Sequence, residues 1–106
     1  MASTQNEEDD DRKRFLDLLE VSPEKAAGFL AESHSADSAA WLADLDEEEA
    51  WRVFSILEAE DQAEILEYAN DTLTAELVGQ MSSPDLRDVV EEMPSDEAAD
   101  ILAEAD

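Results

Sequence analysis

A twelve-residue repeat runs through most of this chain and limits its fold more than any other feature. Seven lines of twelve residues follow one another without a gap, beginning at Pro23, Ser35, Glu47, Ala59, Asp71, Ser83 and Ser95. Every line carries an apolar pair at the same offset, in order Phe29–Leu30, Trp41–Leu42, Val53–Phe54, Ile65–Leu66, Leu77–Val78, Val89–Val90 and Ile101–Leu102. A small residue usually stands three places before the second member of the pair, and an apolar residue often stands three places after it. This spacing is typical of one helix face.

Each line is therefore predicted to form one helix of about two turns, followed by a tight connection. The residues expected to be buried are Ala27, Leu30, Leu42, Phe54, Leu66, Val78, Val90 and Leu102. Trp41 and Trp51 lie at core-like positions, and we interpret them as packing residues rather than as a partner surface. Ser22 and Ser83 each precede a proline and are predicted N-caps, because proline is favoured at the first helical position. Ser95 is a further predicted cap, and the single histidine, His34, is expected to be a helix-end or capping group.

Helices this short are marginal in isolation and must pack against one another to be stable. Two of them make a hairpin of twenty-four residues, and stacked hairpins make an α-solenoid. The predicted fold class is therefore all-α, a right-handed α-solenoid covering residues 12–106. Before the first line, Phe15, Leu16, Leu18 and Leu19 predict a helix that caps the stack. Residues 1–11, "MASTQNEEDDD", lack an apolar pattern and are expected to be a disordered acidic lead-in.

The composition agrees with an all-helical chain, because Gly occurs 2 times, Pro 3 times and Cys not at all. Asp and Glu number 31 against 6 Lys and Arg, for a net charge of −25. Such a surface repels nucleic acid and anionic lipid, and it attracts cations or basic partners. Solubility or adaptation to high salt explains the same charge. No apolar run is long enough to span a bilayer, so we expect a soluble, cytosolic chain.

Two carboxylates near the end of the chain stand out by their spacing. Asp96 and Asp100 are four residues apart, so on a helix they share one face about 6 Å apart, and a cation between them would relieve their repulsion. Glu64, Glu76, Asp88 and Asp100 recur at one offset and can form acidic columns if alternate helices run the same way. A plain solvated face is the competing interpretation. Zinc ligands, a glycine-rich phosphate loop and an activated nucleophile are missing from the pattern, so we do not expect an enzyme.

The residues "HSADSAAWLADLDEEEAWRVFSILEAEDQAEILEYAN", with "SSPDLRDVVEEMPSDEAADILAEAD" after them, carry a family resemblance. The chain resembles the cytosolic N-terminal domain of MgtE-type magnesium transporters and channels over residues 12–106. The twelve-residue spacing, the "His-x-x-Asp" start at His34 and the terminal "S-D-E-A-A-D" from Ser95 are its most specific parts. In shape, the armadillo-like domains of the flagellar motor-switch protein are distant relatives and a competing resemblance.

The resemblance implies a superhelical regulatory domain that is followed by two CBS domains and a membrane pore. In such proteins Mg²⁺ binds acidic residues between the N-domain and the CBS domains, and the compact form closes the pore. The matching ligand positions here are Glu64, Asp96 and Asp100. This chain carries neither the CBS domains nor the pore, through which a homodimer would form, so Mg²⁺ binding to it alone is expected to be weak. The alternative is a helical-repeat scaffold that binds a partner helix or a basic protein through an exposed apolar groove.

Overall fold

The computed structural model describes residues 3–104, and all regular structure in that range is helical. The prediction of an all-α chain is confirmed. The helices are α1 (Ser3–Val21), α2 (Pro23–Glu32), α3 (Ser35–Ala43), α4 (Glu47–Phe54), α5 (Ala59–Tyr68), α6 (Asp71–Gln80), α7 (Ser83–Glu91) and α8 (Ser95–Glu104). Helices α2 to α8 are 8 to 10 residues long and begin at the seven residues at which the sequence lines begin.

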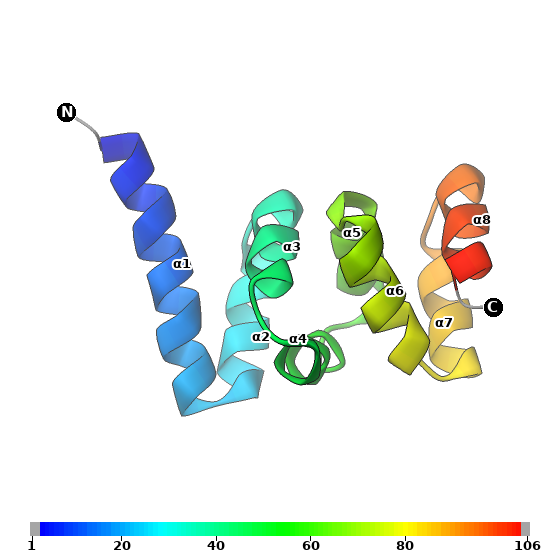
Figure 1. Cartoon of the computed structure of the whole chain (residues 1–106), viewed down its shortest axis with the longest axis horizontal. Coiled ribbons are helices and arrows are strands. Elements are labelled where there is room, and N and C mark those ends of the chain that lie inside the picture. The colour runs from blue at the N-terminus through cyan, green and yellow to red at the C-terminus, as the bar shows by residue number, and fades with distance from the viewer. Residues whose placement is uncertain (1–2, 105–106) are drawn as a thin grey trace.

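The helices follow one another along the long axis of the molecule, from α1 at one end to α7 and α8 at the other (Figure 1). Neighbours in space are mostly two places apart in the chain, because α2 packs on α4, α3 on α5, α4 on α6, α5 on α7 and α6 on α8. The molecule measures 45 × 28 × 21 Å. Alternate packing of this kind lets each short helix bury one face against a helix before it and another against a helix after it.

Helix α1 extends further towards the N-terminus than the sequence pattern indicates. The expected disordered lead-in, residues 1–11, is helical from Ser3 onward, and residues 1–2 lie outside the described part of the chain. Phe15 is fully buried, and Leu16, Leu18 and Leu19 pack against the core, as expected of a capping helix. Once these residues fix the helix on α2, propagation towards the N-terminus is inexpensive.

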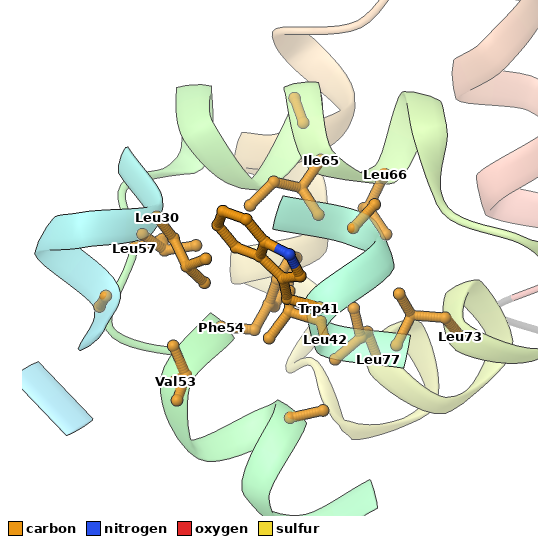
Figure 2. Packing of buried hydrophobic residues seen from close by; sticks show 14 of the residues in the cluster. Leu30, Trp41, Leu42, Val53, Phe54, Leu57, Ile65, Leu66, Leu73 and Leu77 are labelled. Atoms are coloured by element: carbon orange, nitrogen blue, oxygen red, sulfur yellow. The ribbon is translucent and has the colours of Figure 1, made fainter. Parts of the chain in front are cut away.

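The aromatic residues join the first helices into one core. Trp41 is buried, and its ring stacks on Phe15 at 5.8 Å and on Phe29 at 5.9 Å between centroids. Figure 2 shows Trp41 among aliphatic side chains, including Leu30, Ile65 and Leu66, which come from helices on several sides. The packing role predicted for Trp41 is confirmed, and Trp51, although only half-buried, also packs against the core. Burial of this kind is the main favourable contribution to the stability of such a stack.

The predicted core is right for the earlier helices and wrong for the last two. Ala27, Leu30, Leu42, Phe54, Leu66 and Val78 are buried as expected. Val90 is only half-buried and Leu102 is 52% exposed, while the other members of their pairs, Val89 and Ile101, are buried. The difference agrees with position in the stack, because α3 to α6 each pack on the helix two places further on, and no helix in the described range packs on α7 or α8 in that way.

The structure moves the N-cap of two helices away from the serine that the sequence predicts. Ser22 caps α2 as expected, accepting hydrogen bonds from the backbone N–H groups of Glu24 and Lys25. In α7 the cap is Ser82 rather than Ser83, because the Ser82 hydroxyl accepts from the Asp85 N–H at 3.3 Å. Ser95 is the first residue of α8, not the residue before it.

The histidine prediction is confirmed at the start of α3. His34 is the N-cap residue of this helix, and its Nδ1 accepts from the Ala36 N–H at 3.2 Å. An imidazole nitrogen that accepts a hydrogen bond carries no proton itself. His34 therefore has a structural task at this helix end.

Candidate functional site

Asp96 and Asp100 lie on α8, one turn apart, and both are exposed. Asp96 is in the first turn, where the helix dipole favours a negative charge. Asp100 lies one turn further on and lines a hollow of about 180 Å³. The structure thus places these two predicted ligands on one helix, as their spacing indicates.

The hollow beside Asp100 lies between α8 and the ends of α5 and α6. Its lining combines an apolar floor with four carboxylates and a threonine, namely Leu66, Ala69, Met93 and Ile101 with Glu67, Asp71, Glu97, Asp100 and Thr74. Carboxylate oxygens are the ligands that hard divalent cations prefer. The hollow is therefore acidic and partly shielded from water.

Glu97 is the most constrained carboxyl group of this hollow. Its Oε2 atom is buried and has no hydrogen-bond partner among the described residues. Burial raises the pKa of Glu97, and repulsion from the neighbouring Glu67 raises it further. Asp96 and Asp100 add smaller repulsive contributions. Negative charge is thus concentrated around Glu97.

Glu64, the third predicted ligand, lies on α5 beside a different hollow. Its Oε1 accepts a hydrogen bond from the Ser35 hydroxyl of α3 at 3.2 Å. The hollow measures about 410 Å³ and is lined by Ser33, His34, Ser35, Glu64, Glu67 and Tyr68. Because Glu67 lines both hollows, the two lie next to each other along α5.

Asp61 lies on α5 with Glu64 and is a second carboxyl group with a raised pKa. Burial raises the pKa of Asp61, and repulsion from Glu64 and Glu58 adds to the effect. Asp61 and Glu97 are both the third residue of their helices, α5 and α8. The repeat places an acid at this third position in five helices, α3, α4, α5, α7 and α8. Burial raises the pKa of two of these acids, Asp61 and Glu97.

The three predicted ligands do not form one complete metal site on this chain. Among the residues whose side chains are described, no three His, Cys, Asp or Glu come together in a way that could hold a metal ion. Glu64 lies apart from the pair on α8, at the neighbouring hollow. Assignment of Glu64, Asp96 and Asp100 as ligands remains a prediction.

Sequence reasoning missed Glu67 and Glu97, which line the hollow together with Asp100. Glu67 is one turn beyond Glu64 on α5, and Glu97 is next to Asp96. Their proximity depends on how α5 and α8 approach each other, which no local spacing records. An acid at the third position of a helix does not single out Glu97, because Asp37, Glu49, Asp61 and Asp85 share that position.

Cationic side chains do little to offset this acidity. Within the described part of the chain, one ion pair is formed, between Arg12 Nη2 and Asp44 Oδ2 at 3.3 Å, and it is exposed. That pair lies near α1, away from α8. The carboxylates around Glu97 therefore rely on water or on a partner for their counter-charge.

In the same described range, no helix is long and apolar enough to cross a membrane.

Comparison with known proteins gives one match. The family model described as "MgtE intracellular N domain" matches residues 33–106, which is more than half of the chain and includes helices α3 to α8. Neither the search of curated proteins nor the search of solved structures returned a match.

Proposed function

Because the chain belongs to the MgtE intracellular N domain family, we propose that it is the magnesium-sensing regulatory domain of a magnesium transporter or channel. The family match over residues 33–106 is the observation that carries this proposal. The proposed domain acts on the cytosolic side of the membrane and performs no catalysis. Its proposed partners are a pair of CBS domains and the transmembrane pore of the same transporter, with any homodimer formed through those parts.

The proposed sensor residues are Glu64, Asp96 and Asp100. Two of them share a face of α8, and Asp100 borders the hollow that holds Glu67 and Glu97. Mg²⁺ keeps several waters and takes one or two carboxylates from a protein surface. This surface has few cationic side chains. Mg²⁺ could therefore be held jointly by carboxylates of this surface and of a second acidic domain that faces it.

The proposed mechanism follows from electrostatics. Without the ion, the carboxylates around Glu97 repel one another and repel an approaching acidic surface. Mg²⁺ bound between Asp96, Asp100 and a CBS domain replaces this repulsion by attraction, so the cytosolic parts close up and the pore is shut. When Mg²⁺ falls, the domains separate and the pore opens.

The proposed architecture is the right-handed α-solenoid with a twelve-residue repeat. It is supported by helix starts spaced twelve residues apart from Pro23 to Ser95 and by the packing of each helix on the one two places further on. In such a stack each unit contacts only units near it in the sequence. The surface of α5 to α8 is therefore formed by four consecutive units.

The proposal is tested by titrating the chain with MgCl₂ against NaCl at matched ionic strength. Binding to the isolated chain is expected to be weak, on the order of millimolar, because the partner's ligands are missing. At ten times the dissociation constant, mass action predicts about 1.4 kcal/mol of added stability to urea.

The matched variants separate a site from general screening. Asp96→Asn with Asp100→Asn is expected to raise stability without Mg²⁺ and to remove most of the Mg²⁺-specific increment. Glu48→Gln with Glu49→Gln removes two equally exposed charges from α4 and is expected to leave the increment in place. If both double variants respond to Mg²⁺ as the parent does, these carboxylates are only a solvated face.

A second candidate function is a helical-repeat scaffold for another protein. One observation favours it, the exposed apolar surface that α7 and α8 leave at the end of the stack. The two functions are compatible, because the acidic hollow and this surface lie on different residues.

A further inference from the structure

A further hollow lies where α4, α5 and α7 come together, on residues that the proposed sensor does not use. It measures about 160 Å³, and its aromatic and polar lining consists of Trp51, Ser55, Gln62, Asp85 and Asp88. The rest of its lining is apolar. Pockets for whole small molecules usually measure roughly 300–1,000 Å³. This hollow therefore has room for the head group of one side chain rather than for a complete metabolite.

The charge at this hollow is local and of one sign. Asp85 and Asp88 are three residues apart on α7, so they share a helix face, and both are exposed. None of the residues that line the hollow is Lys or Arg, and Arg87 lines a different hollow, beside α8. Within the described part of the chain, neither carboxylate forms an ion pair. The two carboxylates thus present an uncompensated negative charge at this place.

A buried amide adds an acceptor to the hollow. Gln62 is 7% exposed, and its Nε2 donates to the Phe54 carbonyl at 2.8 Å. No described residue donates a hydrogen bond to the Oε1 of the same amide, although the side chain lines the hollow. The Ser55 hydroxyl donates its proton to the Arg52 carbonyl at 3.1 Å, so its oxygen can only accept. Because buried polar atoms are normally paired, the hollow requires a group that donates hydrogen bonds.

Trp51 narrows the choice of donor. It is half-buried, and its ring lies 6.2 Å from the Phe54 ring, tilted by 37°. A cation beside the face of a tryptophan ring is attracted by the ring's quadrupole. A guanidinium group stacks on such rings, carries several N–H donors in one plane and is less strongly hydrated than an ammonium group. Mg²⁺ gives up its water reluctantly. The lining therefore suits a guanidinium group better than an ammonium group or a hydrated metal ion.

We propose that this hollow binds the arginine side chain of a partner protein. The guanidinium group lies beside Trp51, and its N–H groups donate to the two α7 carboxylates and to the amide oxygen of Gln62. The partner's arginine supplies the counter-charge that the lining residues do not. The proposal does not depend on magnesium sensing, because none of the proposed ion ligands lines this hollow.

The test uses three blocked tripeptides as probes, with arginine, lysine or citrulline between two glycines. Citrulline has nearly the shape of arginine without its charge. The indole N–H signals of the two tryptophans are followed by NMR at constant ionic strength, and Trp51→Phe assigns the Trp51 signal by removing it. The arginine peptide is expected to move the Trp51 signal saturably, the lysine peptide to bind several-fold more weakly, and the citrulline peptide to leave the signal in place. The signal of Trp41, which is buried, should not move.

Charge variants locate the binding to α7. Asp85→Asn with Asp88→Asn is expected to weaken binding of the arginine peptide about fivefold or more, the factor that one favourable exposed ion pair supplies. The matched control, Asp10→Asn with Asp11→Asn, removes two exposed carboxylates from α1 at the other end of the molecule (Figure 1) and should change binding less than about twofold. Asp88→Asn alone keeps the acid in the first turn of α7 and is also expected to weaken binding. Unchanged circular dichroism shows that each variant remains folded.

The aromatic contribution is measured through the backbone amide signals of α7. Trp51→Leu removes the ring and is expected to abolish the preference for the arginine peptide over the lysine peptide, because the ring attraction is lost. Trp51→Phe keeps an aromatic ring and is expected to retain part of the preference.

Three results would overturn the proposal. If the lysine peptide binds as tightly as the arginine peptide, or if the α1 control loses as much binding as the α7 variant, the attraction is general electrostatics. If free L-arginine binds more tightly than the blocked peptide, the occupant is a small molecule and not a side chain of a protein. If MgCl₂ moves the Trp51 signal and displaces the arginine peptide at matched ionic strength, the hollow holds a metal ion.

Discussion

The side-chain amide of Gln62 donates a hydrogen bond of 2.8 Å to the backbone carbonyl of Phe54. Phe54 is the last residue of α4 and Gln62 belongs to α5, so the bond ties the two helices together at a carbonyl that also accepts from the Leu57 N–H at 3.1 Å. Ser38 makes the equivalent link between α2 and α3, donating to the carbonyl of Leu30 at 3.2 Å. These bonds fix the turn between the two helices of a hairpin.

Replacing Gln62 by Leu is expected to lower the free energy of unfolding by about 0.5–1.5 kcal/mol, because the buried hydrogen bond to the Phe54 carbonyl is lost. Urea denaturation followed by circular dichroism measures the loss. Gln80→Leu, at an exposed position of α6, is the control and should change stability by less than about 0.5 kcal/mol. Equal effects of the two substitutions would show that the bond to Phe54 contributes nothing of its own.

Core packing predicts a large contrast between two equivalent leucines. Leu66 is buried in α5 and Leu102 is 52% exposed in α8, although both are second members of their pairs. Leu66→Ala is therefore expected to cost about 2–5 kcal/mol, as large-to-small core substitutions do. Leu102→Ala should cost clearly less in the same urea experiment. A loss below about 0.5 kcal/mol at Leu66 would contradict the core assigned here.

The same contrast explains how much of the fold could be predicted from the sequence. The start of each helix is a local property, since the apolar pair and the small residue before it recur at fixed spacing. Burial is not a local property, because Val90 and Leu102 carry the same pattern as Leu66, but no helix among residues 3–104 packs on α7 or α8 from two places further on. The cap at Ser82 rather than Ser83 depends on which hydroxyl reaches the N–H of Asp85, a difference of one residue that the sequence leaves open.

The candidate site likewise has features that helical spacing predicts and features that depend on how the helices pack. The pairing of Asp96 with Asp100 follows from helical spacing alone and is present on α8. The approach of Glu67 to Glu97 joins residues thirty positions apart, through packing that brings α5 near α8. The predicted columns of Glu64 with Asp88 and of Glu76 with Asp100 involve helices that do pack together, and the columns themselves stay a prediction.

Lowering the pH from neutral towards 4.5 is expected to stabilise the chain through Glu97. Its pKa is raised above the ordinary value of 4.5 in the folded state, so the folded state takes up a proton at a higher pH than the unfolded chain does. The repulsive penalty is present above the raised pKa and is relieved as the pH falls through it. Asp61 acts in the same direction.

The control for the pH effect is Glu97→Gln, which cannot titrate. This variant is expected to be more stable than the parent at pH 7 and to gain less stability on acidification, measured as the urea midpoint across the pH range. Glu24 acts in the opposite direction, because a hydrogen bond from the Ser22 hydroxyl lowers its pKa. If acidification destabilises the parent and Glu97→Gln alike, the raised pKa of Glu97 has no part in folding.

Salt is expected to raise the melting temperature, because self-repulsion at a net charge of −25 weakens as the Debye length falls from about 30 Å at 10 mM to about 10 Å at 100 mM. The helix dipole allows a sharper test with two double variants of equal charge change. Glu91→Gln with Glu92→Gln neutralises acids at the C-terminal end of α7, where the dipole disfavours them. Glu47→Gln with Glu48→Gln neutralises acids in the first turn of α4, where the dipole favours them.

At low salt the α7 variant is expected to melt above the parent, since it relieves both the dipole and the general repulsion. The α4 variant should gain nothing or lose stability, because each favourable dipole contact is worth about 0.3–1 kcal/mol and offsets the repulsion that is removed. Both differences should shrink as NaCl is added, and calorimetry at two salt concentrations measures them. If the two variants shift equally at low salt, net charge alone governs stability. If neither shifts and the parent is insensitive to salt, the carboxylates are already compensated by their local surroundings.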